Sequence, residues 1–280
     1  NANFGDMLYA CLFYERCLKA GFQAVDFIQY KGYGIGPFCR QQIGYHTVKS
    51  LFSCFRADAF VIISGGSLWN ESSRTYDAKT RYRRFILPAL IFQWLRKPVY
   101  VLGVGGGPVD TPWLRKKIVK MLNHAQAVTF RDEQTLNIFQ DYGVTNCMRA
   151  TADTVLCIQK SMLPELKEKR ELEESAKGQK KLLLHIPDGT WEVSQIEKHV
   201  IPAIIRFLTT HPDYYLIISH DNIRKLGKQE KDANKQIYAA LQAAGLEYYD
   251  YHYHDCWQMC SLINEMDTII TAKLHVGVVA

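Results

Sequence analysis

Residues 99–108 read VYVLGVGGGP, a short run rich in β-branched residues followed directly by a glycine-rich turn. A run of this length that ends in small residues predicts a buried strand of a parallel sheet. The same pattern recurs along the chain, and helix-length segments separate the runs. Alternating strands and helices predict an α/β fold of βαβ units with doubly wound parallel sheets. The runs are Ala59–Ser64, Val99–Gly103, Ala127–Phe130, Lys181–Ile186, Tyr214–Ser219 and Asp267–Thr271.

The domain organisation follows from where this pattern stops. A chain of 280 residues has room for two domains of ordinary size. Residues 160–181 read KSMLPELKEKRELEESAKGQKK, which is strongly charged and contains no strand-like run. We therefore predict an N-terminal domain over 1–159, a charged linker or helix over 160–180, and a C-terminal domain over 181–280 that is truncated at its C-terminus. The alternative is one domain in which the charged segment is a solvated helix.

Composition narrows the function classes. Hydrophobic residues make up 48% of the chain and charged residues 22%, which excludes a disordered or coiled-coil protein. The net charge of +6 is spread along the chain and favours a small anionic substrate over nucleic acid. Eight cysteines without a CxxC motif predict a reducing compartment. No apolar run is long enough to cross a bilayer, so we expect a cytoplasmic or membrane-peripheral protein without a transmembrane segment.

Candidate binding residues follow the predicted strands, because open α/β sheets bind ligands at the carboxyl ends of their strands. Two glycine-rich turns, Gly65–Gly66 and Gly103–Pro108, would let the backbone approach an anion closely. Neither turn matches a dinucleotide or P-loop fingerprint. Arg131 follows the next run, and its guanidinium can hold a phosphate or carboxylate at two points. Asp132 is predicted to cap a helix that Gly143 closes.

The two ends of the chain carry further polar motifs. Residues 1–8 read NANFGDML, in which Asp6 is predicted to cap a helix from Met7 to about residue 20 and Gly5 permits a tight turn. Near the other end, TAKLHVGVVA places Lys273 and His275 two residues apart. If this segment stays extended, the two side chains share a face and combine a cation with a proton-transfer group.

Other polar residues are secondary candidates. His220 and Asp221 follow a predicted strand, and Asp153 is as readily structural as functional. A structural role is favoured for His185, although its place near a strand end leaves a role in the site open. Residues 251–260, YHYHDCWQMC, supply several metal-ligand types, but their spacing does not suit a structural zinc site. Within them, Asp255 is predicted to cap a helix over Cys256–Asn264.

Six short motifs follow one another along the chain: Asn3–Asp6, Gly65–Leu68, Gly103–Pro108, Arg131–Asp132, Asp153–Leu156 and Lys273–His275. Together and in this order, they resemble the motifs of the polysaccharide pyruvyl transferase family. Two positions depart from the family's pattern, because Lys273 stands where the family commonly has arginine, and Ser67 stands where it commonly has glycine.

The resemblance implies two Rossmann-like domains that face each other across a cleft, as in GT-B glycosyltransferases. It implies transfer of a pyruvyl group from phosphoenolpyruvate to two hydroxyls of a sugar, which forms a cyclic ketal in surface polysaccharide (exopolysaccharide) biosynthesis. No cofactor or metal is expected beyond the donor substrate. Arg131 and His275 would be catalytic, with His275 either the general acid or the group that orients the phosphate. The donor site would comprise Arg131, Lys273, His275, Gly105 and Gly106, and the acceptor site Asn3, Gly5, Asp6, Gly65, Gly66, Ser67 and Trp69.

Two other functions stay open at this point. One is a nucleotide-sugar glycosyltransferase of the GT-B type. The other is a catalytically inactive protein, similar to pyruvyl transferases, that only binds a glycan or a partner; the lysine at position 273 motivates it.

Overall fold

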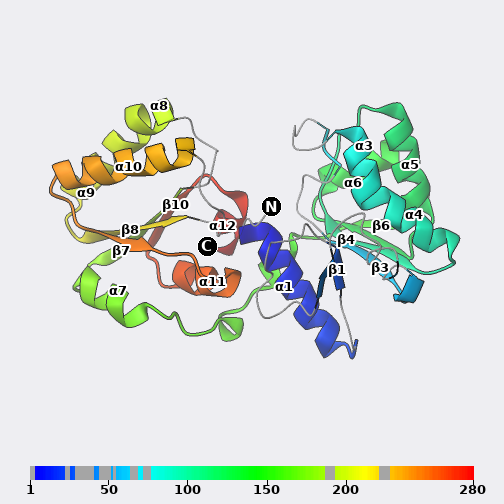
Figure 1. Ribbon diagram of the computed structural model, residues 1–280, viewed down its shortest axis with the longest axis horizontal. Coiled ribbons are helices and arrows are strands. Elements are labelled where there is room, and N and C mark those ends of the chain that lie inside the picture. The colour runs from blue at the N-terminus through cyan, green and yellow to red at the C-terminus, as the bar shows by residue number, and fades with distance from the viewer. Residues whose placement is uncertain are drawn as a thin grey trace. The chain divides into compact units, whose positions relative to one another are not determined.

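The computed structural model describes residues 4–22, 26–28, 41–43, 52, 55–63, 69–71, 77–186, 193–220 and 228–280 (Figure 1). The chain forms two compact units, which we describe separately. The first comprises Tyr9–Leu156, and the second comprises Cys157–Ala280 together with Ala2–Leu8. The division therefore runs through the first helix, α1 (Phe4–Lys19).

The first unit is built on a four-stranded parallel sheet with strand order β3-β4-β5-β6. Helical segments connect these strands, as parallel pairing requires. A separate parallel pair, β1 and β2, precedes this sheet in the chain. The elements that follow α1 are β1 (Asp26–Ile28), β2 (Gln41–Ile43), β3 (Phe60–Ile63), α3 (Ala78–Arg81), the π-helical turn η2 (Tyr82–Ile86), α4 (Leu87–Trp94), β4 (Val99–Val104), α5 (Pro112–Asn123), β5 (Ala127–Phe130), α6 (Glu133–Asp141), β6 (Met148–Ala150) and the 3-10 turn η3 (Thr154–Cys157).

The core of the first unit lies between this sheet and its helices. Val99, Val101 and Val104 of β4 are fully buried, in line with a central strand. They pack in one cluster with apolar side chains from α4, α5 and α6. This packing fixes the positions of the strand ends, where the candidate site begins.

The second unit repeats the architecture with strand order β10-β7-β8-β9, again all parallel. The charged segment between residues 160 and 180 forms a short turn and a helix within this unit. Its elements are η4 (Lys160–Met162), α7 (Lys169–Ala176), β7 (Lys180–Ile186), α8 (Val193–Gln195), η5 (Ile196–Val200), α9 (Ile201–Thr210), β8 (Tyr214–His220), α10 (Lys228–Ala243), β9 (Tyr248–Tyr251), α11 (Cys256–Asn264), β10 (Thr268–Thr271) and α12 (Leu274–Val279).

Helices cover both faces of this second sheet: α8 to α10 lie on one face, and α7 and α11 lie on the other (Figure 1). Leu182 and Leu184 of β7 join the core cluster formed with α9 and α10. Alternate residues of each strand point to the opposite face of the sheet. On that face, Ser219 of β8 contacts Met259 of α11. The predicted α/β class with doubly wound parallel sheets is confirmed, because all six predicted runs form parallel strands.

The local predictions at helix starts have mixed outcomes. Asp132 caps α6 by accepting from the Thr135 N–H, and Asp255 caps α11 by accepting from the N–H groups of Trp257 and Gln258. Both predicted caps are confirmed. The predicted cap at Asp6 is wrong, because α1 already begins at Phe4 and Asp6 lies in its first turn.

Candidate functional site

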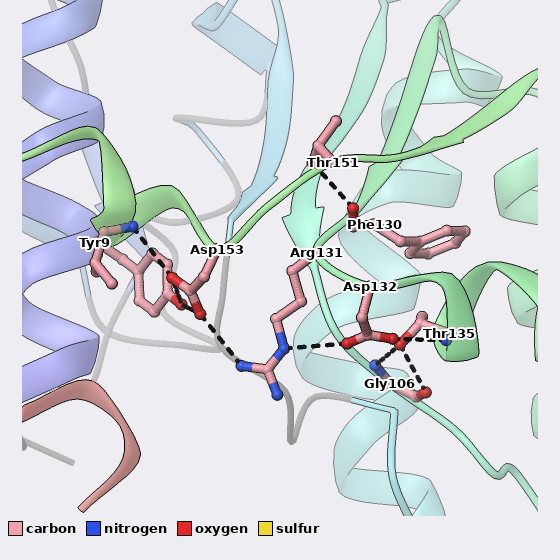
Figure 2. Close-up of polar contacts among 9 residues, drawn as sticks. Tyr9, Gly106, Phe130, Arg131, Asp132, Thr135, Thr151 and Asp153 are labelled. Atoms are coloured by element: carbon pink, nitrogen blue, oxygen red, sulfur yellow. Dashed lines mark hydrogen bonds and ion pairs between the residues drawn. The ribbon is translucent and has the colours of Figure 1, made fainter. Parts of the chain in front are cut away.

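The first candidate cluster lies at the carboxyl end of the sheet in the first unit. Arg131 directly follows β5, and its N–H donates to the Val104 carbonyl at the end of β4. Asp153 follows β6, and between them Thr151 donates its N–H and its hydroxyl to the Phe130 carbonyl at the end of β5. Because parallel strands end at one edge, residues that are 22 positions apart meet there. We call Tyr9, Arg131, Asp132 and Asp153 the arginine cluster (Figure 2).

Two carboxylates hold the guanidinium of Arg131. Its Nε lies 3.4 Å from Asp132 Oδ2, and its Nη1 lies 3.5 Å from Asp153 Oδ2. Figure 2 shows the guanidinium between these two carboxylates. Nη1 is buried, and among the described residues it makes no hydrogen bond. Since buried donors are normally paired, its N–H group can still donate to a ligand oxygen.

Asp153 is in turn held by α1. The Tyr9 hydroxyl lies 2.6 Å from both Asp153 oxygens, and the Val155 N–H donates to Oδ1 at 3.1 Å. Tyr9 is almost completely buried. Burial, the hydrogen bond to Asp153 and the charge of its carboxylate raise the pKa of Tyr9 above its ordinary value. The tyrosine is therefore a neutral donor throughout the physiological range.

The charges of the arginine cluster decide what it can bind. Burial disfavours the charged form of Asp132, but hydrogen bonds from Thr135 and the Arg131 charge outweigh it and lower the pKa of this carboxyl. Two carboxylates then flank one guanidinium. Arg131 therefore contributes directed N–H donors on a fixed fork more than net positive charge.

The glycine-rich turn of residues 103–108 is packed against protein. Gly103 has φ +61°, and a Cβ there would lie 2.6 Å from the Thr154 hydroxyl oxygen. The Gly106 N–H donates to Thr135 Oγ1 at 3.1 Å, and Gly105 is buried. The predicted donor contact through the Gly106 N–H therefore does not fit, because α6 already uses this group.

The second unit holds the other end motifs together. Gly5 in α1 packs against the imidazole of His275, and a Cβ on Gly5 would lie only 2.1 Å from Nδ1 and 2.4 Å from Cγ. Only glycine allows this approach. The N-x-G-D motif thus meets the late motif within one unit, although we assigned Gly5 to the acceptor and His275 to the donor. Asp6 is the next residue of the same helical turn.

The segment with Lys273 and His275 does not stay extended, because a helix begins at Leu274. Lys273 is the last residue before α12, and His275 is the second residue of that helix. The expectation of a shared strand face is wrong, because LHVGVV forms a helical turn in spite of its β-branched residues. The Lys273 N–H donates to Thr271 Oγ1 at 2.9 Å, and His185 Nδ1 lies 3.0 Å from the same oxygen.

The remaining predicted site residues divide into two groups. Trp69 is fully buried, with Phe130 and Phe139 edge-on to its ring, so an acceptor-stacking role does not fit its position. His220 ends β8, and nothing is described of its side chain. The predicted candidates that lie outside the described residues are Asn3, Gly65, Gly66, Ser67 and Asp221.

The motif of residues 251–260 has structural roles where it is described. Asp255 caps α11, Cys256 and Cys260 are buried, and His254 forms an ion pair with Glu168. In the described ranges, no three His, Cys, Asp or Glu side chains are grouped so that they could hold a metal ion. No helix among the described residues is long and apolar enough to cross a membrane.

Comparison with known proteins decides the family. The family model described as "Polysaccharide pyruvyl transferase" matches residues 3–280. The chain belongs to this family. Membership confirms the resemblance of the six motifs and implies a transferase that acts in polysaccharide biosynthesis. A search of curated proteins finds no match.

Solved structures show the fold that this family member adopts. S. aureus MnaA, solved with UDP, is 10% identical with a TM-score of 0.64, over 98% of this chain and 73% of that one. A UDP-N-acetylglucosamine 2-epimerase is 10% identical with a TM-score of 0.63, over 97% and 72% of the chains. Anabaena HepE, solved with UDP and glucose, is 11% identical with a TM-score of 0.51, over 93% and 69%. At these identities the likeness concerns the fold, which is confirmed as GT-B-like with two Rossmann-like units.

Sequence analysis missed Tyr9 and Thr271 and favoured a structural role for His185, with a role in the site left open. Tyr9 lies on the buried face of an apolar helix, where a tyrosine reads as ordinary core. Its one distinguishing signal is position: it follows the N-x-G-D motif by three residues. Thr271 carries a clearer signal, because a threonine that ends a strand can accept the N–H two residues later.

Proposed function

We propose that this family member transfers a pyruvyl group from phosphoenolpyruvate to two hydroxyls of a saccharide and forms a cyclic ketal. The observation that carries the proposal is the environment of the Arg131 guanidinium. Arg131 directly follows a parallel strand, two carboxylates orient it, and its buried Nη1 lies 3.5 Å from Asp153 without a hydrogen bond to the described residues. The carboxylate or phosphate of the donor would accept a hydrogen bond from this N–H group.

The reaction balances without a redox partner. A proton adds to C3 of phosphoenolpyruvate and gives an oxocarbenium-like centre at C2, which a sugar hydroxyl oxygen attacks. The C2–O bond to phosphate then breaks, and the second hydroxyl oxygen takes its place. The attack releases two hydroxyl protons. One returns to the proton donor, which gave its proton to the new methyl group, and the other leaves with phosphate. The enzyme must therefore supply one proton donor, orient two oxygens and hold the departing phosphate.

Arg131 is the proposed donor-binding residue of the first unit. Asp153 and Asp132 fix its fork, and Tyr9 fixes Asp153, so the N–H donors are oriented before the substrate arrives. This preorganisation matters more than net charge, since the two carboxylates offset the guanidinium. Gly105 is the remaining backbone candidate of the glycine-rich turn.

His275 is the proposed proton donor of the second unit. Its Nδ1 side faces the backbone of Gly5, so we assign the proton transfer to Nε2 on the opposite side of the ring. An unperturbed imidazole titrates near pH 6.5 and can deliver a proton near neutrality. Lys273, at the start of the same helix, is the proposed cation for the phosphate. Lysine serves this purpose as a point charge, without the planar fork of arginine.

The experiment is a product assay with phosphoenolpyruvate and free, nucleotide-linked and lipid-linked saccharides. The proposal expects phosphate release that depends on the acceptor, with a product heavier than the acceptor by pyruvate less water. Arg131→Ala and His275→Ala should each lower the rate at least about 100-fold. His124→Ala and Arg170→Ala, at exposed positions, are matched controls and should keep the rate.

Two results would contradict the proposal. Release of a nucleoside diphosphate from a sugar nucleotide, without use of phosphoenolpyruvate, would favour a glycosyltransferase. Binding of a glycan without turnover of either donor would favour the inactive binding protein.

A further inference from the structure

The late motif of the second unit is anchored by a buried histidine that the proposed chemistry does not use. His185 lies in the central strand β7 and is completely buried. Thr271, the last residue of β10, is its register partner. Side chains of register partners project to the same face of a sheet, and His185 Nδ1 lies 3.0 Å from Thr271 Oγ1.

The Thr271 hydroxyl has two polar neighbours among the described residues. Besides His185 Nδ1, the backbone N–H of Lys273 donates to it at 2.9 Å. A hydroxyl can donate one hydrogen bond while it accepts another. The Lys273 N–H donates to the hydroxyl oxygen, and His185 Nδ1 lies within hydrogen-bond distance of the same oxygen, so the two groups together fix the Thr271 side chain.

The Lys273 N–H marks the point where the chain leaves the sheet. Lys273 is extended, with φ −99° and ψ 122°, and α12 begins at the next residue. The hydrogen bond to Thr271 therefore fixes the direction in which α12 starts. One residue further on, the imidazole of His275 packs against Gly5, a contact with little tolerance for displacement.

We propose that His185 and Thr271 are positioning residues for His275. His185 orients the Thr271 hydroxyl, the hydroxyl oxygen holds the Lys273 N–H, and this bond sets the start of α12 and hence the place of the His275 ring. Neither residue touches substrate. The inference rests on the proposed function, because it names the support of the histidine to which we assign proton transfer.

The test compares three substitutions on β10. Thr271→Val keeps the shape of the side chain and removes the hydroxyl, whereas Thr271→Ser keeps the hydroxyl. Thr268→Val is the matched control, because Thr268 begins the same strand and its hydroxyl contacts only Tyr214, at 3.4 Å, among the described residues. Each variant is measured by ketal-transfer kinetics, by thermal unfolding and by NMR of the histidine rings, assigned with His185→Gln and His275→Ala.

The inference expects Thr271→Val to lower kcat/KM for phosphoenolpyruvate about 10- to 100-fold, while Thr271→Ser and Thr268→Val stay within about threefold of the wild type. It expects the His275 ring resonances to move in Thr271→Val and to stay in place in Thr268→Val.

Two results would overturn the inference: wild-type kinetics in Thr271→Val, or unchanged His275 resonances in that variant. The NMR readout needs no substrate. If the wild type forms no ketal, the proposed function fails, and the His275 resonances still decide whether this pair positions His275.

Discussion

The hydroxyl of Tyr9 lies 2.6 Å from each carboxylate oxygen of Asp153, although 144 residues separate the two in the chain. The same carboxylate faces Arg131 Nη1 at 3.5 Å. A residue of the first helix therefore helps to orient an arginine at the end of β5. The geometry of the proposed donor site therefore depends on the hydrogen bond from Tyr9 to Asp153 and on the ion pair of Asp153 with Arg131.

Tyr9→Phe removes the hydroxyl and keeps the ring. A hydrogen bond to a charged group contributes about 1.5–3 kcal/mol. We therefore expect a lower free energy of unfolding and a lower affinity for phosphoenolpyruvate. Asp153→Asn should act through the same arginine, and the double variant should therefore lose less than the sum of the two single losses. Binding by titration calorimetry measures this coupling. Tyr14→Phe, on the same helix, is the control; fully additive losses would show that Tyr9 and Asp153 act independently.

Gly5→Ala places a methyl group where the His275 ring lies. The expected Cβ is 2.1 Å from Nδ1, so the ring or the helix must move, and overpacking of this kind costs about 1–3 kcal/mol. We expect Gly5→Ala to lower both the free energy of unfolding and the rate of ketal transfer. The control is Gly277→Ala in α12, whose Cβ would meet Thr271 Cγ2 at an ordinary 3.8 Å. Alanine there should be neutral or stabilising by up to about 1 kcal/mol. Equal unfolding temperatures of the two variants would refute the contact.

Asp132 has two separable roles, as the cap of α6 and as a neighbour of Arg131. Asp132→Ala should lower the free energy of unfolding by about 1 kcal/mol, whereas Asp132→Asn should keep the cap. Because the folded pKa of Asp132 is lowered, the charged form stabilises the fold above the ordinary pKa of about 4. This contribution is lost as the pH falls through the folded pKa. Denaturant unfolding at pH 7 and pH 3 should therefore show a smaller acid loss in Asp132→Asn than in the wild type.

Alkaline pH should destabilise the protein through its buried tyrosines. Burial raises the pKa of Tyr9, Tyr238 and Tyr251, and burial together with nearby Glu171 raises that of Tyr249 to about 12. Above about pH 10, the unfolded chain releases these protons while the folded chain keeps them. The free energy of unfolding then falls with rising pH. Tyr9→Phe should reduce the slope of this fall. Tyrosinate absorbance measured alongside unfolding checks the cause, and ionisation of these tyrosines at about pH 10 in the folded protein would contradict it.

The sequence was informative wherever a feature is local. The strands could be predicted from short β-branched runs, and the caps at Asp132 and Asp255 from an acidic residue just before an apolar helix. The helix at Leu274–Val279 was missed, because β-branched valines favour a strand in isolation, and the Thr271 hydroxyl that holds the Lys273 N–H is itself held by His185 from a distant part of the chain. The pairing of Tyr9 with Asp153 arises only when the sheet brings its strand ends to one edge. No periodicity within a single segment reports such a pair.

The central claim is that Arg131 binds phosphoenolpyruvate, and direct titration of the ligand into the purified protein tests it. The account predicts binding by the wild type that Arg131→Ala weakens at least about tenfold, that Arg170→Ala and His124→Ala leave unchanged, and that UDP does not displace. Binding of UDP with no heat from phosphoenolpyruvate would contradict the account, as would phosphoenolpyruvate binding that Arg131→Ala leaves unchanged.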